Sequence, residues 1–262
     1  MSFLNKIFPT SGPKEKTVPT NSQKTSPRPP LAPPTLPTER LYELFSIAEE
    51  REVLPRLPSL SGERVLYLNP SSEAFNNHFV EKGASMVLNV GSQIRSAANL
   101  KKVTPLKADI HRLPFQKESI DFVLASLSRH PPFQWTPILT EINRLLKKGG
   151  KAIITDWHPF SPFGKKVRTA TTNPAVGPDE EPYGFERYFK LFRDQALLIG
   201  NVKEVFIDGG FRSFFKTEGE QKFYQQVHSQ PLAIFFFLSK GTTRKEKDGD
   251  RSTASGLTNT AS

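Results

Sequence analysis

Residues 64–90 read RVLYLNPSSEAFNNHFVEKGASMVLNV, and this stretch decides the fold. The apolar run Arg64–Leu68 predicts a short strand. A turn of proline and serine leads into residues 71–82, whose helical apolar spacing, serine N-cap and following Gly83 predict a helix. Residues 86–90 are apolar again and predict a second strand. Two strands joined by one helix pair in parallel through a right-handed crossover, so the stretch predicts an α/β fold.

The same alternation continues along the chain. Helical spacing recurs at residues 40–54, 93–101, 135–147 and 183–198, and strand patterns recur at residues 103–107, 120–126, 151–155, 202–207 and 232–239. The last of these strands is apolar on both faces, which predicts a central position in the sheet. We therefore predict a Rossmann-like, doubly wound α/β sheet in a single domain, with a long Pro/Gly-rich loop at residues 157–182.

The two ends of the chain differ from its body in composition. Residues 1–38 contain nine prolines among Ser, Thr and Lys, and residues 241–262 are polar and charged. Neither end offers enough apolar surface to form a core, so we predict a disordered basic tether, a domain over residues 39–240 and a disordered tail. Half of the net charge of +10 lies in these ends. The charge left in the body is too small and too dispersed to predict a nucleic-acid site.

The sequence lacks two features, cysteine and a long apolar run, and their absence excludes several classes of protein. The chain has no cysteine, which excludes disulfides, thiolate zinc sites and cysteine nucleophiles. No apolar run is long enough to cross a bilayer, and we expect a cytoplasmic protein. The opening residues, Met1–Phe8, place four apolar side chains on one helical face: Phe3, Leu4, Ile7 and Phe8. They are either a frayed terminus or a short segment that docks on a partner or touches a membrane.

Three further stretches follow the strand pattern in a particular order. They are residues 108–115 (ADIHRLPF), residues 119–124 (SIDFVL) and residues 141–150 (EINRLLKKGG). In this order and spacing they resemble motifs of class I S-adenosylmethionine-dependent methyltransferases, specifically the small-molecule, type 11-like group. The resemblance covers roughly residues 61–240. It implies one Rossmann-like domain, and it implies S-adenosylmethionine as cofactor, bound at the carboxyl ends of the early strands.

The loop after the first strand departs from the family pattern. In the family this loop reads DxGxGxG, because its backbone must come close to the cofactor. The acid falls here on Tyr67, and the three glycines fall on Asn69, Ser71 and Glu73. A side chain at a left-handed backbone position costs on the order of 1 to 2 kcal/mol, and asparagine tolerates this conformation best.

The family's second contact is an acid that ends the second strand and binds the ribose hydroxyls. Its position falls here on Gly91 or, one place off, on Val90, and no Asp or Glu occurs between Lys82 and Ala108. A hydrogen bond to a charged group is worth roughly 1.5 to 3 kcal/mol. Losing it would weaken binding by about tenfold to a hundredfold.

One family contact is retained by residue type. Asp109 matches the residue that accepts from the adenine amino group, and Ile110 would supply a backbone amide; alternatively, Asp109 only caps its own turn. The candidate cofactor-binding residues implied by the resemblance are Asn69, Ser71, Gly91, Asp109, Ile110 and Ser126.

No catalytic residue or metal site is predicted. His130-Pro-Pro-Phe133 is similar to a motif of amino-group methyltransferases, but it begins about four residues too late. His158 is either a general base or a surface side chain. The histidines are not spaced as metal ligands, and no acid clusters with them.

Two functions remain open. The chain is either a methyltransferase-fold protein with a degenerate cofactor site, which acts through a protein partner bound by its N-terminal tether, or an active methyltransferase on a small molecule with an atypical cofactor loop. Cofactor titration separates the two.

Overall fold

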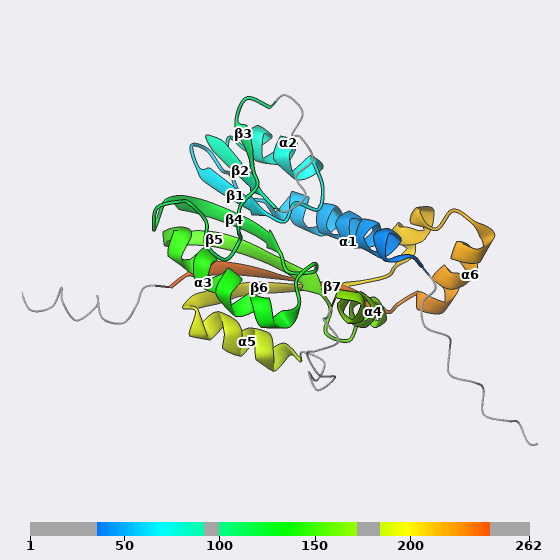
Figure 1. Cartoon of the computed structure of the whole chain (residues 1–262). Coiled ribbons are helices and arrows are strands. Elements are labelled where there is room, and N and C mark those ends of the chain that lie inside the picture. Colours follow the sequence, from blue (N-terminus) through cyan, green and yellow to red (C-terminus); the bar gives the residue numbers. More distant parts are fainter. Residues whose placement is uncertain (1–35, 92–99, 172–183, 242–262) are drawn as a thin grey trace, which may run out of the picture. The chain divides into compact units, whose positions relative to one another are not determined.

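The computed structural model describes residues 36–91, 100–171 and 184–241, and its core is a seven-stranded sheet with the order β3-β2-β1-β4-β5-β7-β6 (Figure 1). The strands are β1 Arg64–Leu68, β2 Met86–Val90, β3 Val103–Leu106, β4 Ile120–Ser126, β5 Leu146–Trp157, β6 Leu197–Phe206 and β7 Pro231–Lys240. The first five strands are parallel, and β7 runs antiparallel between β5 and β6. The predicted doubly wound α/β sheet is confirmed, and so is the central position of the last strand.

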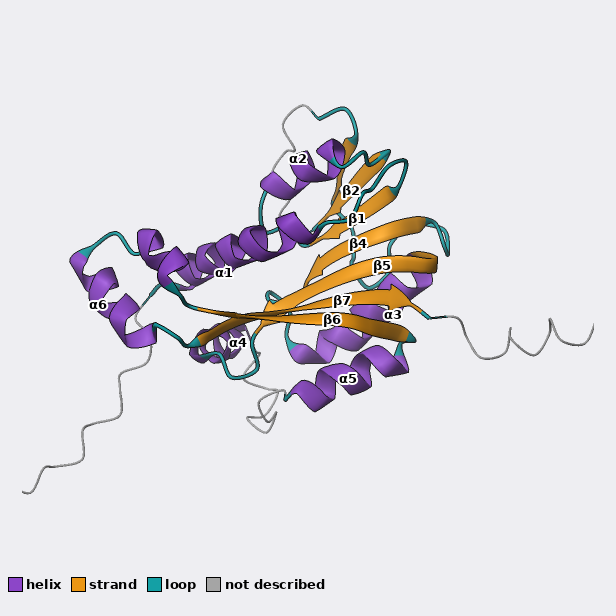
Figure 2. Ribbon diagram, turned by 180° about the vertical axis from the view of Figure 1, so that it is seen from behind, coloured by secondary structure: helices purple, strands orange, loops and turns teal. Residues whose placement is uncertain are grey.

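Helices cover both faces of this sheet (Figure 2). They are α1 Thr38–Val53, α2 Ala74–Glu81, α3 Trp135–Leu145, α4 Pro162–Thr171, α5 Phe185–Asp194 and α6 Glu218–Val227, with 3-10 turns at η1 Leu54–Arg56, η2 Pro132–Gln134 and η3 Gly209–Phe214. The apolar side chains of α1, α2, α4 and α6 belong to one buried cluster, and those of α3 and α5 belong to another. In the described residues no helix is both long and apolar enough to cross a membrane.

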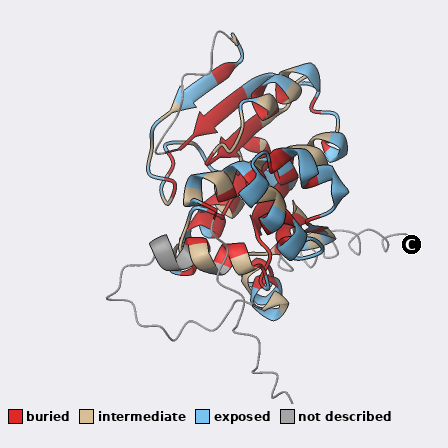
Figure 3. Ribbon diagram, turned by 90° about the vertical axis from the view of Figure 1, so that its right-hand side faces the viewer, coloured by how far each residue is buried: buried red, intermediate tan, exposed pale blue. Residues whose placement is uncertain are grey.

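Strand β1 shows how the sequence produces these two layers. Val65 and Tyr67 belong to the cluster under α1 and α2, whereas Leu66 and Leu68 belong to the cluster under α3 and α5. Successive strand residues point to opposite faces, so an unbroken apolar strand is buried on both sides. Figure 3 shows the result as buried strands between partly exposed helices.

Several element boundaries differ from the prediction. Helix α2 begins at Ala74 rather than Ser71, because residues 69–73 form a turn. Helix α3 ends at Leu145, and the glycine pair lies inside an irregular start of β5, where the register against β4 shifts. Gly149 has φ +73, a left-handed conformation that glycine adopts without steric cost.

Two helices were missed. Helix α4 lies within the predicted loop of residues 157–182, and α6 follows the 3-10 turn η3. Helix α6 has a capping box, in which Thr217 and Glu220 each accept from the other's backbone N–H. The predicted helix at 93–101 falls mainly outside the described residues, as do the predicted tether and most of the predicted tail. The proposed domain limits at 38 and 240 stay predictions.

Candidate functional site

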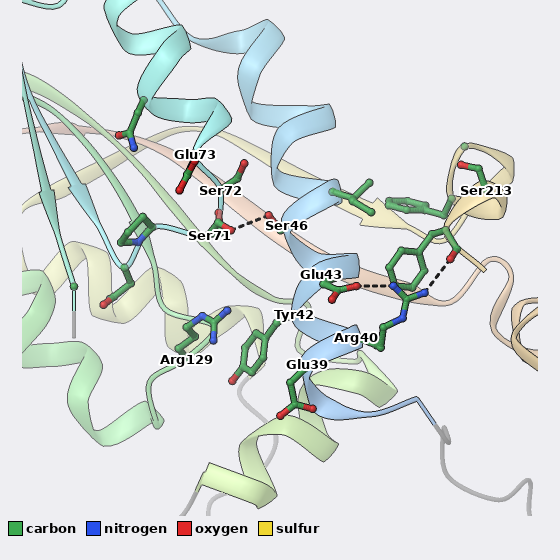
Figure 4. Close-up of a pocket in the computed structure, with 18 of the residues that line it drawn as sticks. Glu39, Arg40, Tyr42, Glu43, Ser46, Ser71, Ser72, Glu73, Arg129 and Ser213 are labelled. Carbon is green, nitrogen blue, oxygen red and sulfur yellow. Dashed lines mark hydrogen bonds and ion pairs between the residues drawn. The ribbon is translucent and has the colours of Figure 1, made fainter. Parts of the chain in front are cut away.

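A cavity of about 1070 Å³ lies at the carboxyl ends of β1 and β2, and α1 and the 3-10 turn η3 form its walls (Figure 4). Asn69, Ser71 and Gly91 line it, so the structure brings together three of the six predicted cofactor residues. The carboxyl edge of a parallel sheet is the usual ligand position in doubly wound folds. This cavity is therefore the candidate site.

The turn that forms the cavity floor is built around Asn69. Asn69 has φ +54, the left-handed conformation for which the family uses glycine. Its backbone N–H donates to the carbonyl of Val90 (2.8 Å), and its side-chain amide donates to the carbonyl of Ser126 (3.3 Å). Asn69 thus joins the ends of β1, β2 and β4.

The hydroxyl of Tyr67 organises the same turn from inside the fold. It accepts hydrogen bonds from the backbone N–H groups of Ser71 (2.9 Å) and Ser72 (3.2 Å). Its ring is buried and packs against Phe75 and Phe79 of α2, with centroids 5.5 and 5.6 Å away. Burial raises the pKa of Tyr67, so the hydroxyl stays neutral. Tyr67 does not line the cavity, and the space above Asn69 is open.

Two amides, from Asn89 of β2 and Asn76 of α2, lie near the position where the family has a carboxylate. Asn89 and Asn76 line the cavity although each is almost fully buried, and the Asn89 amide lies 3.5 Å from the Asn76 side-chain oxygen. The Oδ1 atom of Asn89 has no hydrogen-bond partner among the described residues. Val90 and Gly91 are also buried.

The other three predicted residues lie apart from the cavity lining. Asp109 is exposed and accepts from the backbone N–H of His111 (3.0 Å), and its carboxylate contacts the ring of the same histidine (2.8 Å). These bonds from His111 lower the pKa of Asp109. Ile110 is buried in the cluster under α3 and α5. The hydroxyl of Ser126 pairs with that of Ser128 (2.8 Å).

Glu49 of α1 is a buried polar group that sequence reasoning missed. Its side chain is 2% exposed, and the Thr155 hydroxyl donates to its Oε1. No described residue bonds to Oε2. Burial raises the pKa of Glu49 to about 7, although the nearby hydroxyls of Ser71, Thr155 and Ser126 partly offset that effect. The available signal was its spacing, since Glu49 follows Phe45 by one helical turn and lies beside the apolar stripe.

Two arginines lie at the cavity wall. Arg129 places its guanidinium 3.9 Å from the centre of the Tyr42 ring, and the two side chains face each other in Figure 4. Arg40 donates to the carbonyl of Phe214 and to Glu220 (3.0 Å each), which ties α1 to η3 and α6. The cavity therefore offers mixed charges, hydroxyls and amides. No group of three potential metal-ligating side chains occurs within the described ranges.

Neither histidine that was weighed as a catalytic residue lines the cavity. His158 is 3% exposed, so it is not a surface side chain, and its Nε2 lies 2.9 Å from the Glu204 carboxylate. His130 contacts Gln134 through Nδ1 (3.1 Å), and burial lowers its pKa.

Comparison with known proteins agrees with this geometry. A family model described as "Methyltransferase domain" matches residues 65–154. The demethylmenaquinone methyltransferase of Thermobifida fusca is 27% identical over 141 residues, which cover 48% of this chain and 60% of that protein. The chain thus matches less than two thirds of that relative's length.

Solved structures share the fold at low sequence identity. An S-adenosylmethionine-dependent methyltransferase from Mesorhizobium loti has a TM-score of 0.55 at 17% identity, covering 73% of this chain and 97% of that one. A Haloferax volcanii complex between a methyltransferase and its activator gives a TM-score of 0.54 at 16% identity, covering 79% and 95%. Residues 65–154 thus match a methyltransferase domain, and the sheet order and the solved structures show a Rossmann-like methyltransferase fold.

Proposed function

We propose that this chain keeps the methyltransferase fold, binds S-adenosylmethionine weakly or not at all, and acts through a protein partner rather than by methyl transfer. The observation that carries the proposal is the Tyr67 hydroxyl. From inside the fold, this hydroxyl accepts hydrogen bonds from the backbone N–H groups of Ser71 and Ser72. A loop that holds a cofactor needs such donors on the ligand side. Here the donors stabilise the turn instead.

The end of β2 supports the same proposal. A ribose diol is held best by a carboxylate, which accepts two hydrogen bonds at once. Gly91 has no side chain to accept them, and the neighbouring amides of Asn76 and Asn89 carry no charge. The residues present at these two places do not fit the cofactor as the family holds it.

A protein partner is the remaining part of the proposal. The basic, proline-rich residues 1–38 have the composition of a segment that binds other proteins in extended form. One structural neighbour is a methyltransferase bound to an activator protein, so this fold does support a role within a complex.

Isothermal titration calorimetry of the full chain with S-adenosylmethionine tests the proposal. We expect no binding below millimolar concentration, and a micromolar dissociation constant would refute it. Gly91→Asp restores the missing carboxylate and should strengthen binding by about tenfold to a hundredfold. Gly91→Asn is the matched control, since it adds a side chain of similar size without charge.

A second function is favoured by one observation, the open cavity above Asn69, Ser71 and Gly91. Methyl transfer depends mainly on positioning, so a site with few catalytic side chains could still be an active small-molecule methyltransferase. Release of S-adenosylhomocysteine with the small-molecule fraction of a cell extract would favour this function. Gly91→Trp, which puts a bulky side chain in the cavity, should then abolish release, and Glu186→Ala on α5 should not.

A further inference from the structure

The buried carboxyl of Glu49 lies where α1 meets the ends of the strands. Thr155 of β5 bonds to one of its oxygens, and the other oxygen has no partner among the described residues. One turn earlier, the Ser46 hydroxyl donates to the carbonyl of Ser71 on the cavity floor (3.1 Å; Figure 4). These polar contacts and the apolar packing of Phe45 against Trp157 attach the middle of α1 to the sheet.

The groups that face Glu49 give it little charge compensation. The elements packed against it contribute the Tyr67 phenol from β1, the Arg129 guanidinium from the loop after β4, and the hydroxyls of Ser71, Ser126 and Thr155. Strand β7 contributes the Phe235 ring, which faces Phe45. Arg129 is the only cation among these groups in the described structure, and it stacks on Tyr42 without forming an ion pair with Glu49.

A carboxylate in such surroundings costs much more free energy than a neutral carboxyl, because it loses its hydration without gaining a counter-ion. The pKa of about 7 reflects this cost. The pKa of Glu49 in the folded protein lies above its unfolded value of about 4.3. The protonated carboxyl therefore contributes its full stabilisation to the folded state below pH 4. It is lost as the pH rises through 7.

Helix α1 also forms a wall of the cavity, which Arg40, Tyr42 and Ser46 line. We infer that α1 is a proton-controlled wall: neutral Glu49 keeps the helix docked on the strand ends, and ionised Glu49 loosens the helix and widens the cavity. This inference concerns the helix and does not depend on whether the cavity binds S-adenosylmethionine.

The chain carries its own reporter for this movement. Trp157 is fully buried, and its ring lies 4.7 Å from Phe45 and 6.1 Å from Tyr42, both on α1. The other tryptophan, Trp135, lies in the opposite cluster, so Trp135→Phe leaves one tryptophan that senses α1. Loosening of α1 would expose Trp157 to water and move its emission to longer wavelength.

We expect this emission to shift with a midpoint near pH 7 in the Trp135→Phe protein. Adding Glu49→Gln, which stays neutral at every pH, should abolish the shift. Glu50→Gln, the neighbouring and less buried acid on the same helix, should leave it unchanged. A flat signal between pH 5.5 and 8.5 would overturn the inference. So would an unchanged shift in Glu49→Gln, since that result would assign the titration to another group.

Two measurements keep the test decisive if Trp135→Phe does not fold. With both tryptophans present, Thr155→Ala removes a donor to the ionised carboxylate and should move the midpoint upward; an unmoved midpoint contradicts the inference. In thermal unfolding, the wild type should lose about 3 to 5 °C between pH 6 and pH 8 relative to Glu49→Gln, the shift expected for a tenfold change in the folding equilibrium. If the melting temperatures of the wild type and Glu49→Gln changed equally with pH, that result would also contradict the inference.

Discussion

The turn at residues 69–73 and the segment at residues 141–150 both occupy motif positions of the family, but only the second segment keeps the residue types of its motif. In the second segment, Glu141 accepts from the backbone N–H of Leu113 (2.7 Å) and from two atoms of Arg144 (2.6 and 2.7 Å). Arg144 also donates to the carbonyls of Leu113 and Phe115 (3.1 and 2.9 Å). The pair joins α3 to the loop after β3. All of these hydrogen bonds join one part of the chain to another, and none involves the cavity lining.

The turn at residues 69–73 has the position of its motif and none of the motif's residue types. Its contacts, through Tyr67 and Asn69, also lie within the protein, although the cavity is next to it. The Glu141–Arg144 pair joins two elements of the fold, whereas a glycine-rich loop is required only where a ligand must approach. A match at residues 141–150 therefore indicates the fold, whereas a match at residues 69–73 would indicate cofactor chemistry.

The largest effect is expected from breaking the Glu141–Arg144 pair. Glu141→Ala leaves Arg144 and the Leu113 N–H without their acceptor, and we expect the free energy of unfolding to fall by about 3 kcal/mol. Urea denaturation measures it. Glu186→Ala on the exposed face of α5 is the control and should stay within about 0.5 kcal/mol of wild type. A loss below about 1 kcal/mol for Glu141→Ala would mean that the Glu141–Arg144 pair does not stabilise the fold.

The same pair predicts a pH dependence in acid. Burial alone would raise the pKa of Glu141, but the hydrogen bonds from Arg144 and Leu113 outweigh it and lower the pKa. The folded pKa is then below the unfolded one, so this stabilisation is present above about pH 4.3 and disappears as the pH falls further. Glu141→Gln should flatten the stability curve in that range, as measured by urea midpoints from pH 5 to pH 2. Equal slopes for the two proteins would contradict this.

A smaller effect is expected in the turn. Tyr67→Phe removes the acceptor of two backbone N–H groups, and we expect a loss of about 1 to 3 kcal/mol in urea denaturation. Tyr224→Phe, whose hydroxyl donates to the carbonyl of Asp208, is the matched control and should lose only about 0.5 to 1.5 kcal/mol. If Tyr67→Phe matched wild type, the turn would not depend on the hydroxyl.

The smallest effect is expected at Asn69. Asn69→Gly relieves a positive φ and loses one hydrogen bond to Ser126, so stability should stay within about 1 kcal/mol of wild type. Asn69→Ala keeps the unfavourable φ, loses the bond and should cost about 1 to 2 kcal/mol. Thermal unfolding of the two variants side by side checks the order. Because both variants lose the amide, a reversed order would mean that the positive φ of residue 69 does not decide its stability.

The sequence predicted the sheet well because its central strands, such as β1, β4 and β7, are buried on both faces. Apolar runs such as residues 86–90 and 232–239 leave few alternatives to a parallel core and a central strand. Helix limits were less accurate. The hydroxyl of Tyr67 sets the start of α2 by fixing the N–H groups before it, and that contact joins residues whose relation is visible only after folding.

The candidate site was predicted in part. Asn69, Ser71 and Gly91 line the cavity because they lie at strand ends that a parallel sheet brings to one edge. Glu49 was missed because its partner Thr155 is 106 residues away, and periodicity within one helix carries no information about such a partner. Helix α6 was missed because a capping box outside an obvious apolar pattern is a weak signal by itself.

The polar contacts of α1 have a consequence for the order of folding. The helix bonds to Ser71, then to Thr155, Asp208 and Glu220, at sequence separations of 25, 106, 157 and 180 residues. During synthesis α1 leaves the ribosome before nearly all of these partners exist, and pairings of such long range form slowly. We expect α1 to dock late, so nascent chains that stop before β5 should show little hydrogen-exchange protection in this helix.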